Sequence, residues 1–180
     1  GKTTTTTLTG EIMKAHFGKD KTFVVGNIGN PYTLEADKTS KDSVTVGEIS
    51  SFQLETIHTF HPVVSAILNI TPDHLNRHHT MEAYVAAKEA VASQQTKADI
   101  CVLNYDNDYT RDFAGRCPAT PVLFSSHHEL ENGYFLRGDK IIKSVNGEEH
   151  ELMDIHKDMN LVGLCNVENV MAAIAIAEGM

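Results

Sequence analysis

The sequence VVSAILN, residues Val63–Asn69, decides the fold class of this chain. It is nearly continuous in apolar character and rich in β-branched residues, a pattern typical of a strand that is covered on both faces. Strands of this kind belong to parallel sheets that carry helices on their two faces. The segment therefore predicts an α/β architecture.

Segments on either side of this strand alternate between strand and helix patterns. Short β-branched or apolar runs predict strands, and apolar residues three or four positions apart predict helices. The predicted strands are Thr22–Asn27, Val44–Ile49, Val63–Asn69, Ile100–Asn104 and Val122–Ser125. Helices are predicted after the opening threonines, where Leu8, Ile12 and Ala15 have helical spacing, and over Met81–Ser93, Asp106–Ala114 and Asn166–Glu178. This alternation predicts a mostly parallel sheet flanked by helices.

Residues Gly133–Leu152 have a different pattern. Apolar and polar residues alternate there, and turn signals stand at Gly138-Asp139 and Asn146-Gly147. Alternation interrupted by such dipeptides is typical of hairpins. We therefore expect a small antiparallel meander at the end of the sheet.

The length and composition fit one acidic globular domain. The chain has 180 residues, enough for one domain with a substantial core. Its formal net charge of −9 gives no general attraction for nucleic acid or anionic lipid, so we expect neither as a partner. No apolar run approaches the ~18 residues of a spanning helix, and no signal peptide is visible. The three cysteines are odd in number and widely spaced, which favours a reducing, cytoplasmic location over a disulfide framework.

The chain opens with Gly1-Lys2-Thr3, the last three residues of the phosphate-binding motif G-x-x-x-x-G-K-[ST]. In that motif backbone amides cradle the phosphates, the lysine reaches the β and γ oxygens, and the hydroxyl ligates Mg²⁺. Three residues are a weak signal, and a frayed N-terminus is the alternative. A phosphate loop normally follows a buried strand. We therefore expect that strand and the rest of the loop upstream of Gly1, and an unpaired sheet edge without them.

Polar side chains follow the predicted strands at the edge where open α/β sheets bind ligands. They are Asn27, Glu48, Ser50 and the pair Asp73-His74. A carboxylate at the position of Glu48 suits Mg²⁺, and the alternative is an ordinary solvated strand end. His74 and His78 are four residues apart, as in a zinc pair, but no catalytic glutamate stands between them, so we do not favour zinc.

Lys88 lies on the apolar stripe of the predicted helix Met81–Ser93. From the residues alone we favour a snorkelling side chain, with its stem buried and its ammonium in water. The alternative is a desolvated amine of low pKa with chemistry of its own. At the start of the last helix, Asn166 is interpreted as an N-cap, and a base-reading role is the alternative for Asn166 or Asn169.

Taken together and in order, these segments resemble the Mur ligase family over essentially all 180 residues. The motifs that carry the resemblance are GKTT at 1–4, GNIG at 26–29, NITPDHL at 69–75, YVAAK at 84–88 and NVEN at 166–169. The segment EISSFQLE at 48–55 is similar to the D-glutamate-adding branch of the family. Two positions depart from the family pattern: Cys165 stands where histidine often precedes the NxxN motif, and Asn76 where aspartate is common.

The resemblance implies an ATP-dependent ligase of peptidoglycan precursor synthesis. Such an enzyme phosphorylates the carboxylate of UDP-N-acetylmuramoyl-L-alanine, and the amine of D-glutamate then attacks the acyl phosphate. The implied cofactors are ATP and two Mg²⁺ ions. The family's flanking domains, one gripping the UDP and one bringing in D-glutamate, are absent here. We therefore interpret residues 1–180 as the central ATP-binding domain, cut within its phosphate loop, and expect it not to ligate alone.

The resemblance also implies a role for each site residue. Lys2, His74 and a carbamylated Lys88 would be catalytic. ATP would be held by Gly1, Lys2, Thr3, Thr4, Asn166 and Asn169, the two asparagines facing adenine. The substrate would contact Asn27, Ser50, Gln53 and His74, and the metal ions would bind Thr3, Glu48, His74 and Lys88. We expect Glu48, His74 and Lys88 to converge beside Gly1–Thr3 at the carboxyl edge of one sheet.

Two rival interpretations remain. One is another carboxylate–amine ligase of the same superfamily, against which the segment EISSFQLE argues. The other is a nucleotide-binding fragment without catalytic activity, because the flanking domains are missing.

Overall fold

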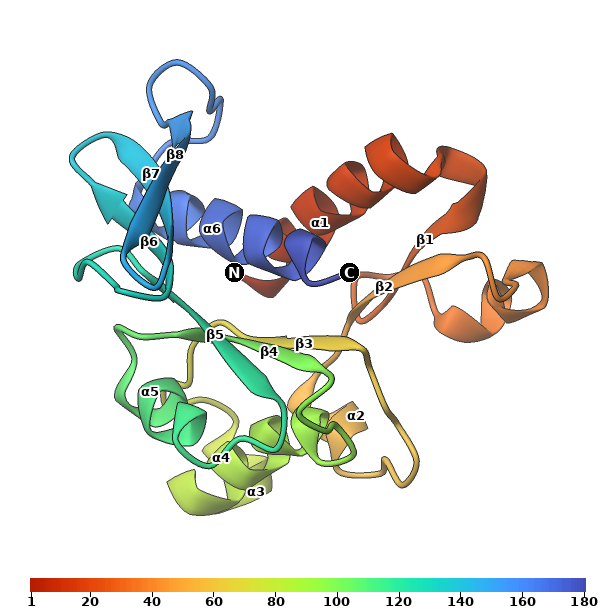
Figure 1. Cartoon of the computed structure of the whole chain (residues 1–180). Coiled ribbons are helices and arrows are strands. Elements are labelled where there is room, and N and C mark those ends of the chain that lie inside the picture. The colour runs from red at the N-terminus through yellow and green to blue at the C-terminus, as the bar shows by residue number, and fades with distance from the viewer.

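The computed structural model describes residues 1–180 and contains two sheets with helices packed around them (Figure 1). Strands β1 (Thr22–Gly26) and β2 (Val44–Glu48) form a parallel two-stranded sheet, and β3 to β8 form a second sheet in chain order. The α/β class with a mostly parallel sheet is confirmed. The expectation of one sheet is wrong, because β2 pairs only with β1 and β3 only with β4. Strands β2 and β3 therefore each have one edge that pairs with no other strand.

The larger sheet is parallel from β3 to β6 and antiparallel from β6 to β8. Its strands are β3 (Val64–Ile67), β4 (Ile100–Asn104), β5 (Thr120–Ser125), β6 (Gly133–Arg137), β7 (Lys140–Val145) and β8 (Glu148–Asp154). The predicted meander is thus confirmed. Its two turns contain Gly138 and Asn146, with φ of 57° and 53°, conformations that glycine and asparagine adopt most readily.

Six α-helices and four short 3₁₀ segments complete the chain. The helices are α1 (Lys2–Phe17), α2 (Ser51–Leu54), α3 (Leu75–His78), α4 (Met81–Glu89), α5 (Asp108–Ala114) and α6 (Leu164–Glu178). The 3₁₀ segments are Lys19–Lys21, Tyr32–Leu34, Ala36–Lys38 and Ala90–Ala92. Helix α4 is shorter than predicted because its last turn tightens into the 3₁₀ segment. None of the helices combines the length and the apolar character that crossing a bilayer requires.

The interpretation of Asn166 as the N-cap of α6 is wrong. The cap is Gly163, whose φ of 98° lets the chain turn into the helix, and α6 begins at Leu164. Asn166 lies inside the first turn, where its side-chain amide donates to the carbonyl of Val162 at 2.8 Å.

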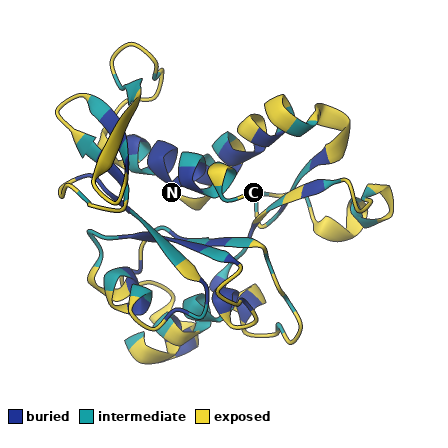
Figure 2. Ribbon diagram, in the orientation of Figure 1, coloured by how far each residue is buried: buried dark blue, intermediate teal, exposed yellow.

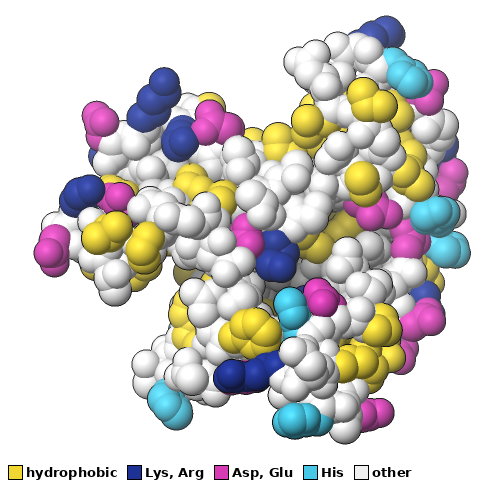
Figure 3. Space-filling model, turned by 180° about the vertical axis from the view of Figure 1, so that it is seen from behind, with side chains coloured by type: hydrophobic (Ala, Val, Ile, Leu, Met, Phe, Trp, Pro, Cys, Tyr) yellow, Lys and Arg dark blue, Asp and Glu magenta, His cyan; other side chains and the backbone are white.

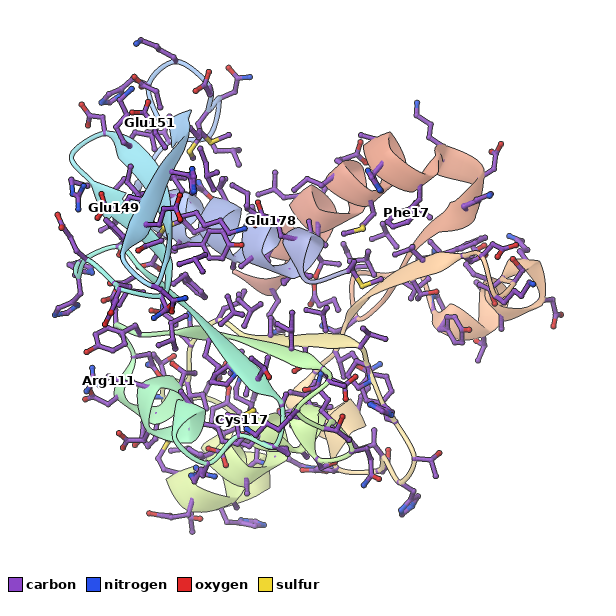
Figure 4. The ribbon with its side chains drawn as sticks, viewed as in Figure 1. Phe17, Arg111, Cys117, Glu149, Glu151 and Glu178 are labelled. Atoms are coloured by element: carbon purple, nitrogen blue, oxygen red, sulfur yellow. The ribbon has the colours of Figure 1, made fainter.

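The core has two parts, one on each face of the larger sheet. Alternate residues of β4 divide between them: Cys101 and Leu103 face α4 and α5, whereas Val102 faces α6. Cys117 lies on the α4–α5 side (Figure 4). Figure 2 shows the buried residues following the central strands and the face of α6. Burial on both faces explains why this part of the sequence reads as a continuous apolar strand.

Candidate functional site

The first turn of α1 is an electrically positive end without an acidic side chain. The first backbone hydrogen bond of the helix runs from Thr5 N to Gly1 O, at 3.1 Å, so the amides before Thr5 have no intrahelical acceptor. Lys2 and Thr3 are exposed beside them. Free amides, a lysine and a hydroxyl at a helix N-terminus attract a phosphate group.

Asn169 ties this end of α1 to α6, and the two helices lie side by side (Figure 1). Its Oδ1 accepts from the Gly1 amino group at 2.8 Å and from the Thr5 hydroxyl at 3.1 Å, while its Nδ2 donates to Asn166 Oδ1 at 3.2 Å. A small cavity beside it is lined by Gly1, Leu68, Asn69, Phe124, Cys165, Glu168 and Asn169. The residues predicted for the nucleotide, Gly1–Thr4 and the two asparagines, are therefore neighbours.

Glu48 ends β2 with a carboxylate that is 4% exposed. Its Oε1 accepts from Asn27 Nδ2 at 2.9 Å, whereas its buried Oε2 has no hydrogen-bond partner. Gly26 permits this geometry: its φ is 97°, and a Cβ there would lie 2.2 Å from the Glu48 carbonyl oxygen. Buried carboxylate oxygens are rarely left unpaired. An unpartnered one fits a divalent cation that prefers oxygen ligands.

Ser50 and Gln53 form the capping box of α2, whose N-cap Ser50 directly follows Glu48 and Ile49. Ser50 Oγ accepts from the Gln53 amide at 3.3 Å, and Gln53 Oε1 accepts from the Ser50 amide at 2.9 Å. Two of the predicted substrate residues, Ser50 and Gln53, thus fix each other's positions by these hydrogen bonds. The side-chain nitrogen of Gln53 has no partner in the chain and is exposed.

His74 precedes α3 in the left-handed conformation, with φ of 54°. Its Nε2 lies 3.4 Å from a carboxylate oxygen of Asp73, and its ring centroid lies 5.0 Å from that of Phe52. Non-glycine residues held at positive φ gather at functional sites. His74 is the N-cap of α3 and His78 is its last residue, so the two histidines are not an i, i+4 pair within one helix.

Lys88 is half-buried on α4, with Nζ 5.0 Å from the centre of the Tyr84 ring. Burial lowers the pKa of Lys88, the charge of Lys2 lowers it further, and Asp73 opposes them. The half-buried side chain fits both interpretations, and the lowered pKa is the direction that the desolvated amine requires. Lys2 of α1 and Asp73, which follows β3, both act on the charge of Lys88. Figure 3 shows basic, histidine and acidic side chains around a hollow on the back face of the molecule. Glu48 ends β2, which packs against α1. Its approach to His74 and Lys88 stays a prediction.

A second polar cluster, around Asp106, was not predicted from the sequence. Its carboxylate accepts from the Ser125 hydroxyl at 2.6 Å, the Ser126 amide at 2.7 Å and the His128 ring at 2.9 Å. Ser126 in turn donates to Glu168 at 2.7 Å. Asp106, His127 and Glu168 carry ligand atoms within 4.8 Å of one another. Since hydrogen bonds already engage both oxygens of Asp106, we interpret the cluster as a brace between the end of β5 and α6.

The Mur ligase middle domain family model matches residues 1–177. Among curated proteins, the UDP-N-acetylmuramoylalanine–D-glutamate ligase of Lachnospira eligens is 57% identical over 178 residues, 99% of this chain and 39% of that protein. The ligase of the same name from Lachnoclostridium phytofermentans is 58% identical over 177 residues, 98% of this chain and 38% of that protein. The chain thus spans about two fifths of the length of these relatives.

Solved structures share the fold at low sequence identity. A UDP-N-acetylmuramoyl-L-alanyl-D-glutamate–2,6-diaminopimelate ligase matches with a TM-score of 0.72 and 22% identity, over 98% of this chain and 40% of that one. MurF from Acinetobacter baumannii matches with a TM-score of 0.68 and 17% identity, over 99% of this chain and 40% of that one. At these identities the likeness establishes the fold alone.

We predict that Glu48→Gln abolishes stabilisation by Mg²⁺ without destabilising the apo fold. Glutamine keeps the shape and an acceptor for Asn27, and it removes a buried carboxylate of which one oxygen has no partner. Thermal unfolding with and without Mg²⁺ and an ATP analogue measures both effects. A variant that melts well below the unsubstituted protein without Mg²⁺, or that still gains stability from the ion, would contradict the assignment.

We predict that Asp106→Asn lowers the free energy of unfolding at pH 7 by about 1–3 kcal/mol. Burial would raise the pKa of Asp106, but hydrogen bonds from Ser125, His128 and the Ser126 amide outweigh it and hold the pKa well below its usual range. The stabilisation is therefore present above the unfolded pKa of about 4 and is lost as the pH falls towards the folded pKa. Urea titrations from pH 7 to pH 3 should show a flatter pH dependence in the variant, and equal slopes would refute the brace.

Proposed function

The chain belongs to the Mur ligase middle domain family, and on this basis we propose that it is the ATP- and magnesium-binding middle domain of a D-glutamate-adding ligase. The whole enzyme would join D-glutamate to UDP-N-acetylmuramoyl-L-alanine in the cytoplasmic synthesis of peptidoglycan precursors. Two curated relatives named for this activity, at 57% and 58% identity, support the proposal. The segment EISSFQLE at 48–55 supports the D-glutamate branch over other ligases of the superfamily.

The observation that carries the proposal is the buried, unpartnered Oε2 of Glu48, on a strand that packs against α1. A carboxylate oxygen that prefers a cation and a helix end that prefers an anion suit a metal–phosphate complex. Lys2 would neutralise the β and γ phosphates of ATP, with Gly1, Thr3 and Thr4 around them. Asn166 and Asn169 would face adenine at the cavity beside α6. This pairing favours a nucleotide site over a fragment without ligand-binding function.

The reaction proceeds in two displacements. The substrate carboxylate attacks the γ-phosphorus of ATP, the bond to the β-phosphate oxygen breaks, and ADP leaves. The amine of D-glutamate then attacks the acyl carbon, phosphate leaves, and the nitrogen loses a proton as the amide forms. This domain would position the reactants and neutralise charge. These two effects dominate the catalysis of phosphoryl transfer.

Thr3, Glu48, His74 and Lys88 are the residues that we propose to hold two Mg²⁺ ions. Bound Mg²⁺ would neutralise charge on the transferring phosphoryl oxygens. Asn27, Ser50, Gln53 and His74 would orient the UDP-N-acetylmuramoyl-L-alanine. The exposed, unpartnered side-chain nitrogen of Gln53 is suited to donate a hydrogen bond to this acidic substrate.

Lys88 acts in this scheme as a carbamate. Its lowered pKa increases the fraction of neutral amine. That amine attacks CO₂ and releases a proton, which converts a cation into an oxygen ligand of the kind that Mg²⁺ prefers. Without this change, the ammonium group would repel a metal ion.

A ligation assay on the full-length protein, with both flanking domains, tests the proposed function. With ATP, Mg²⁺ and UDP-N-acetylmuramoyl-L-alanine, we expect phosphate release and amide formation with D-glutamate but not with diaminopimelate. The 180-residue chain alone should not ligate, because it spans about two fifths of its relatives' length and the sites for uridine and D-glutamate would lie on the remainder. Preference for another amino acid would overturn the D-glutamate assignment, and ligation by the chain alone would overturn the domain assignment.

We predict that Lys88→Ala in the full-length enzyme lowers kcat by about 100-fold or more, since an oxygen ligand near the transferring phosphoryl group is lost. Short carboxylates such as acetate should restore part of the activity by occupying the space of the carbamate. Lys14→Ala is the control: Lys14 is a partly buried lysine of α1 paired with Glu11, and its loss should leave kcat unchanged. Full activity of the Lys88 variant would refute the role.

A further inference from the structure

His78 is the only buried histidine among the ten in the chain, with 7% of its surface exposed. Its ring stacks on Phe52 of α2, with centroids 5.5 Å apart and planes inclined by 17°. On its other side lies Tyr84 of α4, at 5.1 Å. Helices α2, α3 and α4 therefore meet at this one ring.

Both ring nitrogens of His78 face polar groups of α2 and of the residue that follows it. Nε2 lies 3.0 Å from the Ser51 hydroxyl, and Nδ1 lies 3.2 Å from a carboxylate oxygen of Glu55. A carboxylate only accepts hydrogen bonds, so it favours a proton on Nδ1. Nε2 of the neutral ring is then free to accept the Ser51 hydroxyl proton, a hydrogen bond that spans 27 positions of sequence.

The contacts of His78 with Ser51 and Glu55 resemble the serine–histidine–carboxylate arrangement of a hydrolase triad. Ser51, however, is poorly placed to attack a substrate. Ser51 is 8% exposed, and its neighbour Phe52 covers the histidine. A nucleophile must reach its substrate. The geometry therefore favours a role in holding α2 over covalent catalysis.

The network connects the two halves of the proposed site. Ser51 is flanked by Ser50 and lies in the same short helix as Gln53, the proposed substrate residues. Phe52 contacts the ring of His74, and Tyr84 lies under the Lys88 amine at 5.0 Å. A shift of His78 would thus be transmitted to substrate-binding and metal-binding residues together.

We propose that His78, as the Nδ1–H tautomer, is a positioning residue that fixes the substrate-binding helix α2 against the metal-binding residues His74 and Lys88. The inference rests on the proposed function for its kinetic consequences, whereas the tautomer follows from the geometry alone. Because the proposed ATP groups lie on α1 and α6, loss of the His78 contacts should spare ATP binding.

The test variant is His78→Phe in the full-length enzyme, which keeps the ring between Phe52 and Tyr84 and removes both nitrogens. We expect the KM for the UDP-linked substrate and the half-saturating Mg²⁺ concentration to rise by about 10-fold. The KM for ATP should stay within about twofold, because its proposed binding groups do not contact the network. A purely structural role would instead lower the amount of active enzyme and leave all three constants unchanged, which would overturn the proposal.

A double-mutant cycle and a matched control sharpen the test. Ser51→Ala should give a similar effect, and the double variant should be no worse than either single one, because both remove the same hydrogen bond. His61→Phe is the control: His61 also lies against a carboxylate, that of Asp99 at 2.8 Å, but at the opposite end of β3. Its constants should match those of the unsubstituted enzyme, and additive effects of Ser51→Ala and His78→Phe would contradict the network.

Nitrogen NMR of the full-length protein labelled with ¹⁵N-histidine separates this inference from the proposed function. At neutral pH, His78 should show a protonated Nδ1 and an unprotonated Nε2, even if the protein does not ligate D-glutamate. The resonance is assigned by its absence from the His78→Phe spectrum. A proton on Nε2 instead would overturn the assignment whatever the kinetics show.

Discussion

A carboxylate held out of water at the end of β2 constrains the rest of this structure. Burying the charge of Glu48 is costly unless its oxygens are paired, and the chain pairs only one of them, through Asn27. Gly26 of β1 approaches the backbone of Glu48 closely. The pairing of β1 with β2 then brings Asn27 to the Glu48 carboxylate. The local electrostatics therefore favour a cation, and the free amides at the start of α1, which packs against β2, favour a phosphate.

The two ends of the chain supply the other half of the arrangement. Asn169 fixes α6 to the start of α1 through a carbonyl oxygen that accepts two hydrogen bonds. The Asp106 cluster holds the loop after β5 against Glu168, which is next to Asn169 in α6. These contacts hold the start of α1 in place. Groups that are already in position lower the free-energy cost of binding a ligand and of stabilising charge that develops on it.

Much of the fold could be predicted because it depends on local patterns. Strand β4 covers Ile100–Asn104 as predicted, since burial on both faces leaves a continuous apolar run. The meander was predicted by its turn residues. The separation of β2 from β3 into two sheets could not be predicted, because strand pairing depends on residues that are distant in sequence. The N-cap of α6 was misassigned since a glycine three residues upstream takes the positive φ.

The contacts between the candidate site residues could be predicted only in part. Lys2, Glu48 and Asn169 were selected by motif and by position in the sequence. Ser50 and Gln53 form a capping box in the structure, and their spacing of three residues could have predicted it. The partners of His78 and Asp106 were unpredictable, because Ser51 and Ser125 lie 27 and 19 positions away. Side-chain networks of that range have no periodic signature in a sequence.

Crystals of the full-length protein grown with Mn²⁺ and a non-hydrolysable ATP analogue test the central claim most directly. The account predicts an anomalous manganese peak about 2 Å from Oε2 of Glu48, bridging to the phosphates at the start of α1. A second peak should lie beside His74 and Lys88. Manganese at Asp106, His127 and Glu168 with none at Glu48, or phosphates away from α1, would contradict it.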